Sequence, residues 1–130
     1  MAIKNVLGSQ GVVSFNVEAG AHMVLSVSEL QDCDGGSIDL VVGPVIQLVD
    51  DTSGGGEAHL TDDHAILGNV IIIPSPQTNN FAVYPPTGGG LYGSTAGINA
   101  AFYNLSLGEN LMLVCFDATT GASKWMASVI

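Results

Sequence analysis

Hydrophobic and polar residues alternate along much of this chain with the period of two that is typical of β-strands. In one such run, Leu111, Leu113 and Cys115 fall on one side of the expected strand. Residues 45–49 and 70–73 are instead apolar at nearly every position, as in strands that are covered on both faces. The alternating runs occupy residues 13–17, 23–27, 38–42, 81–83, 111–116 and 125–129.

Clusters of glycine, proline and acidic residues separate these runs and predict chain reversals. Helix signals are weak: Ser28 and Gln31 have the spacing of a capping box, but Gly35 follows soon after, and residues 94–101 have room for only a turn or two. We therefore expect an all-β chain, a single-domain β-sandwich or β-barrel over residues 1–130 with about eight to ten short strands. The turn segments are residues 18–21, 34–36, 43–44, 54–56, 74–76, 85–86, 88–90 and 108–110.

Charge is sparse and strongly acidic. Asp, Glu, Lys and Arg make up 11% of the residues, against roughly 25% in an ordinary domain. There is no arginine, Lys4 and Lys124 are the two lysines, and the net charge is -10. Such a chain repels phosphate, so we expect neither nucleic acid nor an anionic membrane surface as a partner.

The charge is also unevenly placed. Residues 65–108 contain no Asp, Glu, Lys, Arg or His, whereas ten of the twelve carboxylates precede His64. Because uncharged surface favours association, we expect the neutral segment to supply a subunit interface and the acidic loops 32–34, 50–57 and 62–64 to face solvent. The alternative, a buried core segment, stays open. The expected interface residues are Phe81, Tyr84, Pro85, Pro86, Leu91, Tyr92, Phe102 and Tyr103.

The N-terminus and the cysteines indicate neither a targeting segment nor a metal or redox site. The first ten residues lack the apolar core of a secretory signal, and no apolar run approaches the roughly 20 residues of a membrane helix. Cys33 and Cys115 fit no metal-binding or redox spacing, so we interpret them as reduced, small, buried residues. A single disulfide between them remains open.

One histidine-aspartate cluster is a weak candidate for a metal site. His59, Asp62, Asp63 and His64 lie close together, and imidazole with carboxylate can bind zinc or iron(II). No special local geometry requires this spacing. We favour a solvated acidic loop, with a pH-sensing role for the histidines as a further alternative, and we expect no metal and no cofactor.

Other chemical motifs are incomplete, and we predict that the chain is not an enzyme. No G-x-S-x-G nucleophile elbow is present, and residues 88–90 are glycines with no lysine following. Residues 32–36 resemble half of a calcium loop but lack the further oxygen ligands, so an ordinary turn capped by Asp side chains is expected.

Several short motifs follow one another in the second half of the chain. They are N-F-A-V-Y-P-P-T-G-G at 80–89, N-A-A-F at 99–102, L-G-E at 107–109, L-V-C-F-D at 113–117 and K-W at 124–125. Together they resemble a group of small tailed-bacteriophage proteins encoded near capsid genes. The resemblance covers roughly residues 78–127, and this chain departs from the group at residues 119–123, where a shorter turn is expected before Trp125.

This resemblance implies a virion structural protein, most plausibly a capsid decoration or cement protein. Such a protein would sit as a homo-oligomer, commonly a trimer, on the capsid exterior, with the major capsid protein as partner and assembly in the host cytoplasm. It names no catalytic residue.

Two alternatives remain. A receptor- or carbohydrate-binding module of a tail fibre or surface assembly would be favoured by an exposed ring of Tyr92, Tyr103 or Trp125, since aromatic side chains also suit a sugar platform. A small cupin-like metalloenzyme would be favoured if His59 and His64 pointed into a barrel mouth.

Overall fold

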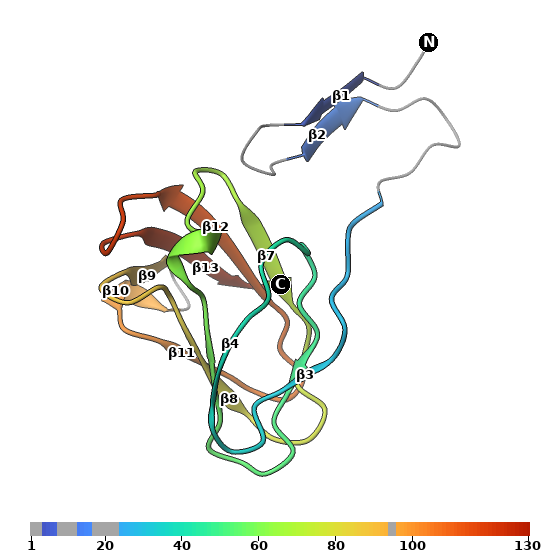
Figure 1. Ribbon diagram of the computed structural model, residues 1–130, viewed down its shortest axis with the longest axis vertical. Coiled ribbons are helices and arrows are strands. Elements are labelled where there is room, and N and C mark those ends of the chain that lie inside the picture. The colour runs from blue at the N-terminus through green and yellow to red at the C-terminus, as the bar shows by residue number, and fades with distance from the viewer. Residues whose placement is uncertain (1–3, 8–12, 17–23, 94–95) are drawn as a thin grey trace.

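The computed structural model of this protein describes residues 4–7, 13–16, 24–93 and 96–130 (Figure 1). The fold is all-β, as predicted, and within the described ranges the one helical element is a 3-10 turn, η1 (Asp62–His64). No described helix is long and apolar enough to cross a membrane. The strands are β1 (Lys4–Leu7), β2 (Val13–Asn16), β3 (Gln31–Asp32), β4 (Ser37–Asp39), β5 (Val49–Asp50), β6 (Glu57–His59), β7 (Val70–Ile73), β8 (Phe81–Tyr84), β9 (Gly90–Gly93), β10 (Gly97–Ala100), β11 (Tyr103–Leu105), β12 (Leu111–Asp117) and β13 (Lys124–Val129).

The larger sheet has five strands in the order β10-β9-β13-β12-β7. Its centre is antiparallel: β12 pairs with β13 on one side and with β7 on the other, so that Leu113 lies between Ala127 and Ile71. β9 joins the other edge of β13 in parallel, and Leu91 pairs with Trp125 there. The N-terminal strands β1 and β2 pair with each other as a separate antiparallel hairpin.

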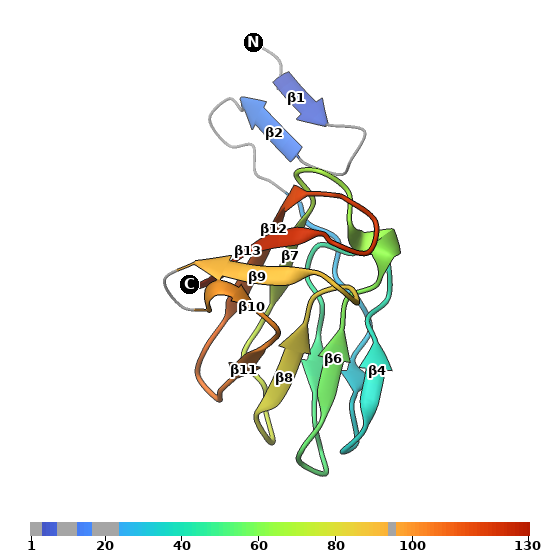
Figure 2. The ribbon, with the colours of Figure 1, turned by 90° about the vertical axis from the view of Figure 1, so that its left-hand side faces the viewer.

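The second sheet has four strands in the order β11-β8-β6-β4, and three of them run parallel. Figure 2 shows β4, β6 and β8 side by side. The strands that precede them along the chain are stacked in parallel too, because β3 pairs with β5 and an isolated bridge joins Ile46 to Ile72 of β7. The chain therefore crosses three times through a turn to the four-stranded sheet: from β3 to β4, from β5 to β6 and from β7 to β8. The pairings among the described residues do not close into a barrel.

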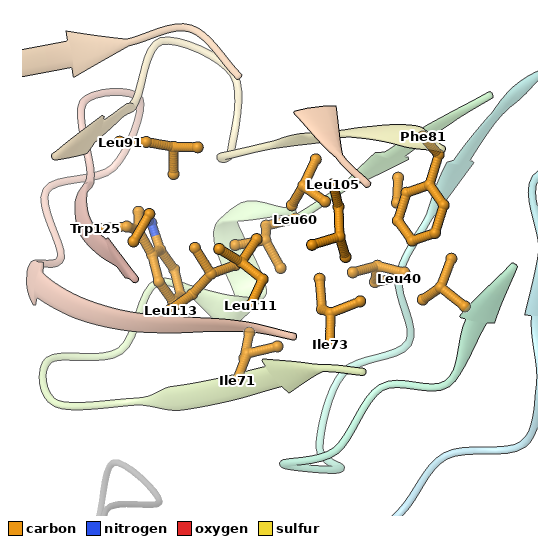
Figure 3. Packing of buried hydrophobic residues seen from close by; sticks show 14 of the residues in the cluster. Leu40, Leu60, Ile71, Ile73, Phe81, Leu91, Leu105, Leu111, Leu113 and Trp125 are labelled. Atoms are coloured by element: carbon orange, nitrogen blue, oxygen red, sulfur yellow. The ribbon is translucent and has the colours of Figure 1, made fainter. Parts of the chain in front are cut away.

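One hydrophobic core fills the space between the two layers (Figure 3). Trp125 and Leu113 come from the five-stranded sheet, Phe81 and Leu105 from the four-stranded one, and all are at most 2% exposed. Burial of apolar surface on this scale is the main force that stabilises such a fold.

The alternation predicted for 111–116 is confirmed, because its odd-numbered residues are buried. In 125–129 it holds at Trp125 and Ala127, but Val129 is 36% exposed. In 38–42, Leu40 is buried, whereas β4 ends at Asp39 and Val42 is 51% exposed.

Some predicted elements differ in the structure. In the run 23–27, the described part holds only an isolated bridge at Val27, and Val24 is 82% exposed. The turn or two of helix expected in 94–101 is replaced by β10, while Met23 and Val17 lie outside the described residues.

The two cysteines are free and buried, as predicted. Burial raises the pKa of the Cys33 thiol to about 11 and raises that of Cys115 as well. Because the thiolate is the reactive form, burial lowers the reactivity of both thiols in the folded protein.

Candidate functional site

Two carboxylates of the expected solvent-facing loop are buried, which corrects the prediction for residues 50–57. Asp51 is fully buried, and its carboxylate accepts hydrogen bonds from the backbone N–H groups of Gly35 (2.8 Å) and Gly56 (2.7 Å). Asp50 is 6% exposed and accepts from both the backbone N–H and the hydroxyl of Thr78 (2.9 and 2.7 Å). A buried carboxylate persists when backbone donors satisfy it in this way.

These two residues hold three turns together. Asp51 bridges the β3–β4 turn and the β5–β6 turn, while Asp50 reaches the β7–β8 turn. Burial raises the pKa of each carboxyl, but the hydrogen bonds from Thr78 to Asp50 and from the backbone of Gly35 and Gly56 to Asp51 outweigh it, so both pKa values lie below the usual range. Their role is structural. The other aspartates of the expected acidic loops, Asp32, Asp34, Asp62 and Asp63, are exposed as predicted.

The histidine-aspartate cluster does not gather into a metal site. His64 is 1% exposed: its Nδ1 accepts the Thr61 N–H at 2.9 Å, which leaves Nε2 to donate to the Val41 carbonyl at 2.9 Å. Both ring nitrogens are therefore occupied within the fold. His59 lies on β6 rather than in a loop, while Asp62 and Asp63 point to solvent. Across the part of the chain that the structure describes, no three such groups lie within reach of one ion.

An aromatic row crosses the outer face of the four-stranded sheet. The His59 and Tyr84 rings stack with centroids 4.4 Å apart, and Phe102 lies on Tyr84 at 5.1 Å. Glu57 accepts hydrogen bonds from His59 Nε2 (2.9 Å) and the Ser37 hydroxyl (2.8 Å), which together hold its pKa below the usual range. His59, Tyr84 and the 85–89 turn line a shallow cleft beside this row.

The expected interface residues divide between core and surface. Phe81 and Leu91 belong to the hydrophobic core, so for them the core alternative holds, and Pro85 and Pro86 are buried at the edge of the shallow cleft. These residues lie on β8, on β9 and on the turn between the two strands. The remaining expected interface residues keep some exposure: Tyr84, Tyr92 and Tyr103 are partly buried and Phe102 is 42% exposed.

Tyr92, Tyr103 and Trp125 do not form the exposed group of aromatic side chains that would favour a carbohydrate-binding module. Trp125 is fully buried, and its indole N–H donates to the Ser123 hydroxyl at 3.1 Å. Tyr103 is partly buried, and its hydroxyl donates to the Glu109 carboxylate at 2.9 Å. Of that set, only Tyr92 lies on an outer sheet surface.

The outer face of the five-stranded sheet is apolar across four strands. The register places Val114 beside Val70 on one side and Met126 on the other, and Met126 beside Tyr92. Because Leu113, Cys115 and Trp125 point into the core, these neighbours point outward. We call the following residues the outer sheet face: Ile72, Met112, Val114, Phe116, Met126 and Tyr92.

Charge enters this surface only at one end. Lys124 on β13 pairs in register with Asp117 on β12, and their charged atoms lie 4.0 Å apart. Both side chains are more than a third exposed, so the pair is a weak one. Phe116 (44% exposed) and Met126 (46% exposed) lie between this pair and the apolar rows, and the Phe116 ring meets Tyr92 edge-on.

The interface predicted from the uncharged segment 65–108 does not include Phe116 and Met126, because both residues lie outside that segment. The signal was present in the alternation itself. In 111–116 the residues opposite the buried positions, such as Met112, Val114 and Phe116, are apolar as well. A strand with one face in the core and a second apolar face needs cover on both sides.

Searches against protein-family models, curated proteins and solved structures found no match to this chain.

Proposed function

We propose that this chain is a structural virion protein, a capsid decoration or cement protein that packs as a homo-oligomer on the capsid exterior. The observation that carries this proposal is the outer sheet face, which spreads over four adjacent strands. Phe116 and Met126 are exposed on it, its other four residues are partly exposed, and Ser128 beside Met112 is a polar position on the same side of the sheet. Single exposed apolar side chains are ordinary, but contiguous apolar patches on a folded protein mark contacts with other macromolecules.

Further exposed apolar residues lie beyond this face and add to the support. Leu30, Leu67 and Ile98 are each more than half exposed. Charged residues make up only 11% of the chain, so few charges surround these apolar side chains. A surface of this kind is poorly suited to a free monomer and well suited to a shell component with several neighbours. The resemblance of residues 78–127 to small phage proteins supplies the virion context.

The distribution of charge fits an outward-facing side. Asp32 and Asp34 are exposed at the end of β3 and in the turn that follows it, and Asp62 and Asp63 are exposed on η1. None of these residues belongs to the strands of the outer sheet face, so an attached protein could keep them in solvent. The net charge of -10 also disfavours contact with packaged DNA.

Binding to shells tests this function directly. Empty shells would be assembled from the major capsid protein encoded by the same genome and sedimented with increasing amounts of this chain. We expect saturable binding at a fixed ratio to the shell subunits, and shells that withstand a higher temperature when decorated. Sedimentation of shells without the chain at every concentration would contradict the proposal. Naked DNA under the same conditions is the negative control.

A receptor- or carbohydrate-binding module is the second candidate, and one observation favours it. The row of His59, Tyr84 and Phe102 lies beside a cleft and next to the Glu57 carboxylate, and aromatic rings with a nearby acceptor suit a sugar. Saturable chemical-shift changes confined to these residues on titration with soluble saccharides would support this second function over the first.

A further inference from the structure

We infer that the outer sheet face seats a second copy of this chain, with two identical faces packed against each other about a two-fold axis. The inference rests on the proposed assembly role and assigns that role a partner and a surface. Its six residues are apolar or, for Tyr92, amphipathic, and they come from β7, β9, β12 and β13.

Electrostatics restrict how two copies can meet. Each chain carries a net charge of -10, so most relative orientations oppose carboxylates to carboxylates. The strands β7, β9, β12 and β13 carry only Lys124 and Asp117 as charged residues, and these two cancel. Contact through these four strands therefore brings no strand carboxylate other than Asp117 into the paired surface, and the exposed carboxylates of Asp32 and Asp34 lie on β3 and in the turn after it. A cationic partner would instead be drawn to those turns.

The charged pair at the rim is self-complementary. In a two-fold contact each patch meets its own copy, so a group on one chain faces a different group on the other. Lys124 and Asp117 lie on adjacent strands at the same end of the face. A two-fold axis that lies in the plane of the interface and runs along the strands between β12 and β13 can place Lys124 of each copy near the partner's Asp117. A patch with one positive and one negative group allows such an exchange.

The shape of the surface suits the same contact. Two sheets pack face to face at about 10 Å through interdigitating side chains. Met112 and Met126 at the middle of the face are flexible and fill irregular gaps in an interface. Phe116 and Tyr92 already pack edge-on, with ring centroids 5.4 Å apart, which holds both rings in place before any partner arrives.

Molar mass by size-exclusion chromatography with light scattering tests the inference, with circular dichroism to confirm that each variant folds. We expect a two-chain mass for the parent, and a dissociation constant weakened by at least about tenfold in Met126→Asp and in Phe116→Asp. Leu107→Asp is the matched control: Leu107 is 52% exposed but lies on the turn between β11 and β12, so its mass should not change.

A charge exchange tests the two-fold arrangement. Lys124→Asp alone opposes two carboxylates across the axis and should weaken pairing, whereas the double variant Lys124→Asp, Asp117→Lys should restore it. A single-chain parent, a three-chain parent, or a two-chain mass that survives both Met126→Asp and Phe116→Asp would each overturn the inference.

The same variants separate this inference from the proposed function when they are sedimented with shells. If Met126→Asp becomes a single chain and still binds shells, the pairing is supported and the shell contact lies elsewhere. If the parent is a single chain and Met126→Asp no longer binds shells, the shell protein occupies this face; the pairing is then overturned while the function stands. A two-chain parent that never binds shells supports the pairing and contradicts the function.

Discussion

The Asp51 carboxylate accepts the Gly35 backbone N–H at 2.8 Å, and this bond joins two turns that are 16 residues apart in the sequence. Its other oxygen accepts the Gly56 N–H at 2.7 Å. The stacked arrangement of β4 and β6 depends on these turns keeping their positions, because both strands are only three residues long.

Replacing Asp51 with asparagine should therefore destabilise the fold. The amide group puts a donor where an acceptor is needed, and it leaves one buried N–H without a partner. We expect a loss of roughly 2–3 kcal/mol in the free energy of unfolding, measured by urea denaturation. The matched control is Asp63→Asn at an exposed site, which should change stability by no more than about 0.5 kcal/mol. Equal effects of the two substitutions would contradict a structural role for Asp51.

Gly56 occupies a position with no room for a side chain. A Cβ placed there would lie 2.5 Å from the Cβ of Cys33 and 2.7 Å from the Cγ of Asp51. We expect Gly56→Ala to cost roughly 1–3 kcal/mol through overpacking. In Gly36→Ala the nearest heavy atom would be 3.6 Å away, so that variant should be close to neutral. Thermal unfolding of the two variants side by side checks the contrast, and a neutral Gly56→Ala would contradict it.

The buried carboxylates predict how stability depends on pH. Both pKa values are lower in the folded state than the usual 3.8, so their stabilising contribution is present above the unfolded value and is lost as the pH falls through the folded value. We expect the free energy of unfolding to fall on acidification below about pH 5. The decline should be shallower in the double variant Asp50→Asn, Asp51→Asn. If the free energy of unfolding fell equally steeply with decreasing pH in the parent and in the double variant, this linkage would be contradicted.

Leu105 and Leu107 are two residues apart at the end of β11, but their burial is very different. Leu105 is fully buried and Leu107 is 52% exposed. We expect Leu105→Ala to cost roughly 2–5 kcal/mol, because a buried methyl-lined cavity remains, and Leu107→Ala to cost less than about 0.5 kcal/mol. Chemical denaturation followed by Trp125 fluorescence measures both. A large effect at Leu107 would mean that its turn is covered in solution.

Local alternation was sufficient to predict β12 and β13, because each antiparallel strand has one face in the core. It could not predict the parallel pairing of β4, β6 and β8. Ser37 pairs with Glu57, and Glu57 pairs with Ala82. The partners of each pair are therefore 20 or more positions apart in the sequence, with another strand between them. Strands of three or four residues carry too little pattern to specify such pairing, and parallel neighbours require crossover connections that leave no hairpin signal.

The misplaced acidic residues have a similar cause. Sequence alone assigns Asp50 and Asp51 to the surface, since isolated carboxylates are costly to bury. Their partners are backbone N–H groups of Gly35, Gly56 and Thr78, which any sequence possesses, so no residue type reveals the contact. The sequence pattern likewise predicted a subunit interface in residues 65–108, with a buried core segment as the alternative, and Phe81 lies in the core. The surface that we propose for assembly is on β7, β9, β12 and β13, whose outward residues are mostly apolar.

The molar mass of the unmodified chain in solution, measured by light scattering over rising concentration, tests the claim that the outer sheet face pairs with a second copy most directly. We expect a mass that approaches two chains, and a return to the mass of one chain when Met126 is replaced by aspartate. A mass of one chain at every concentration would contradict it.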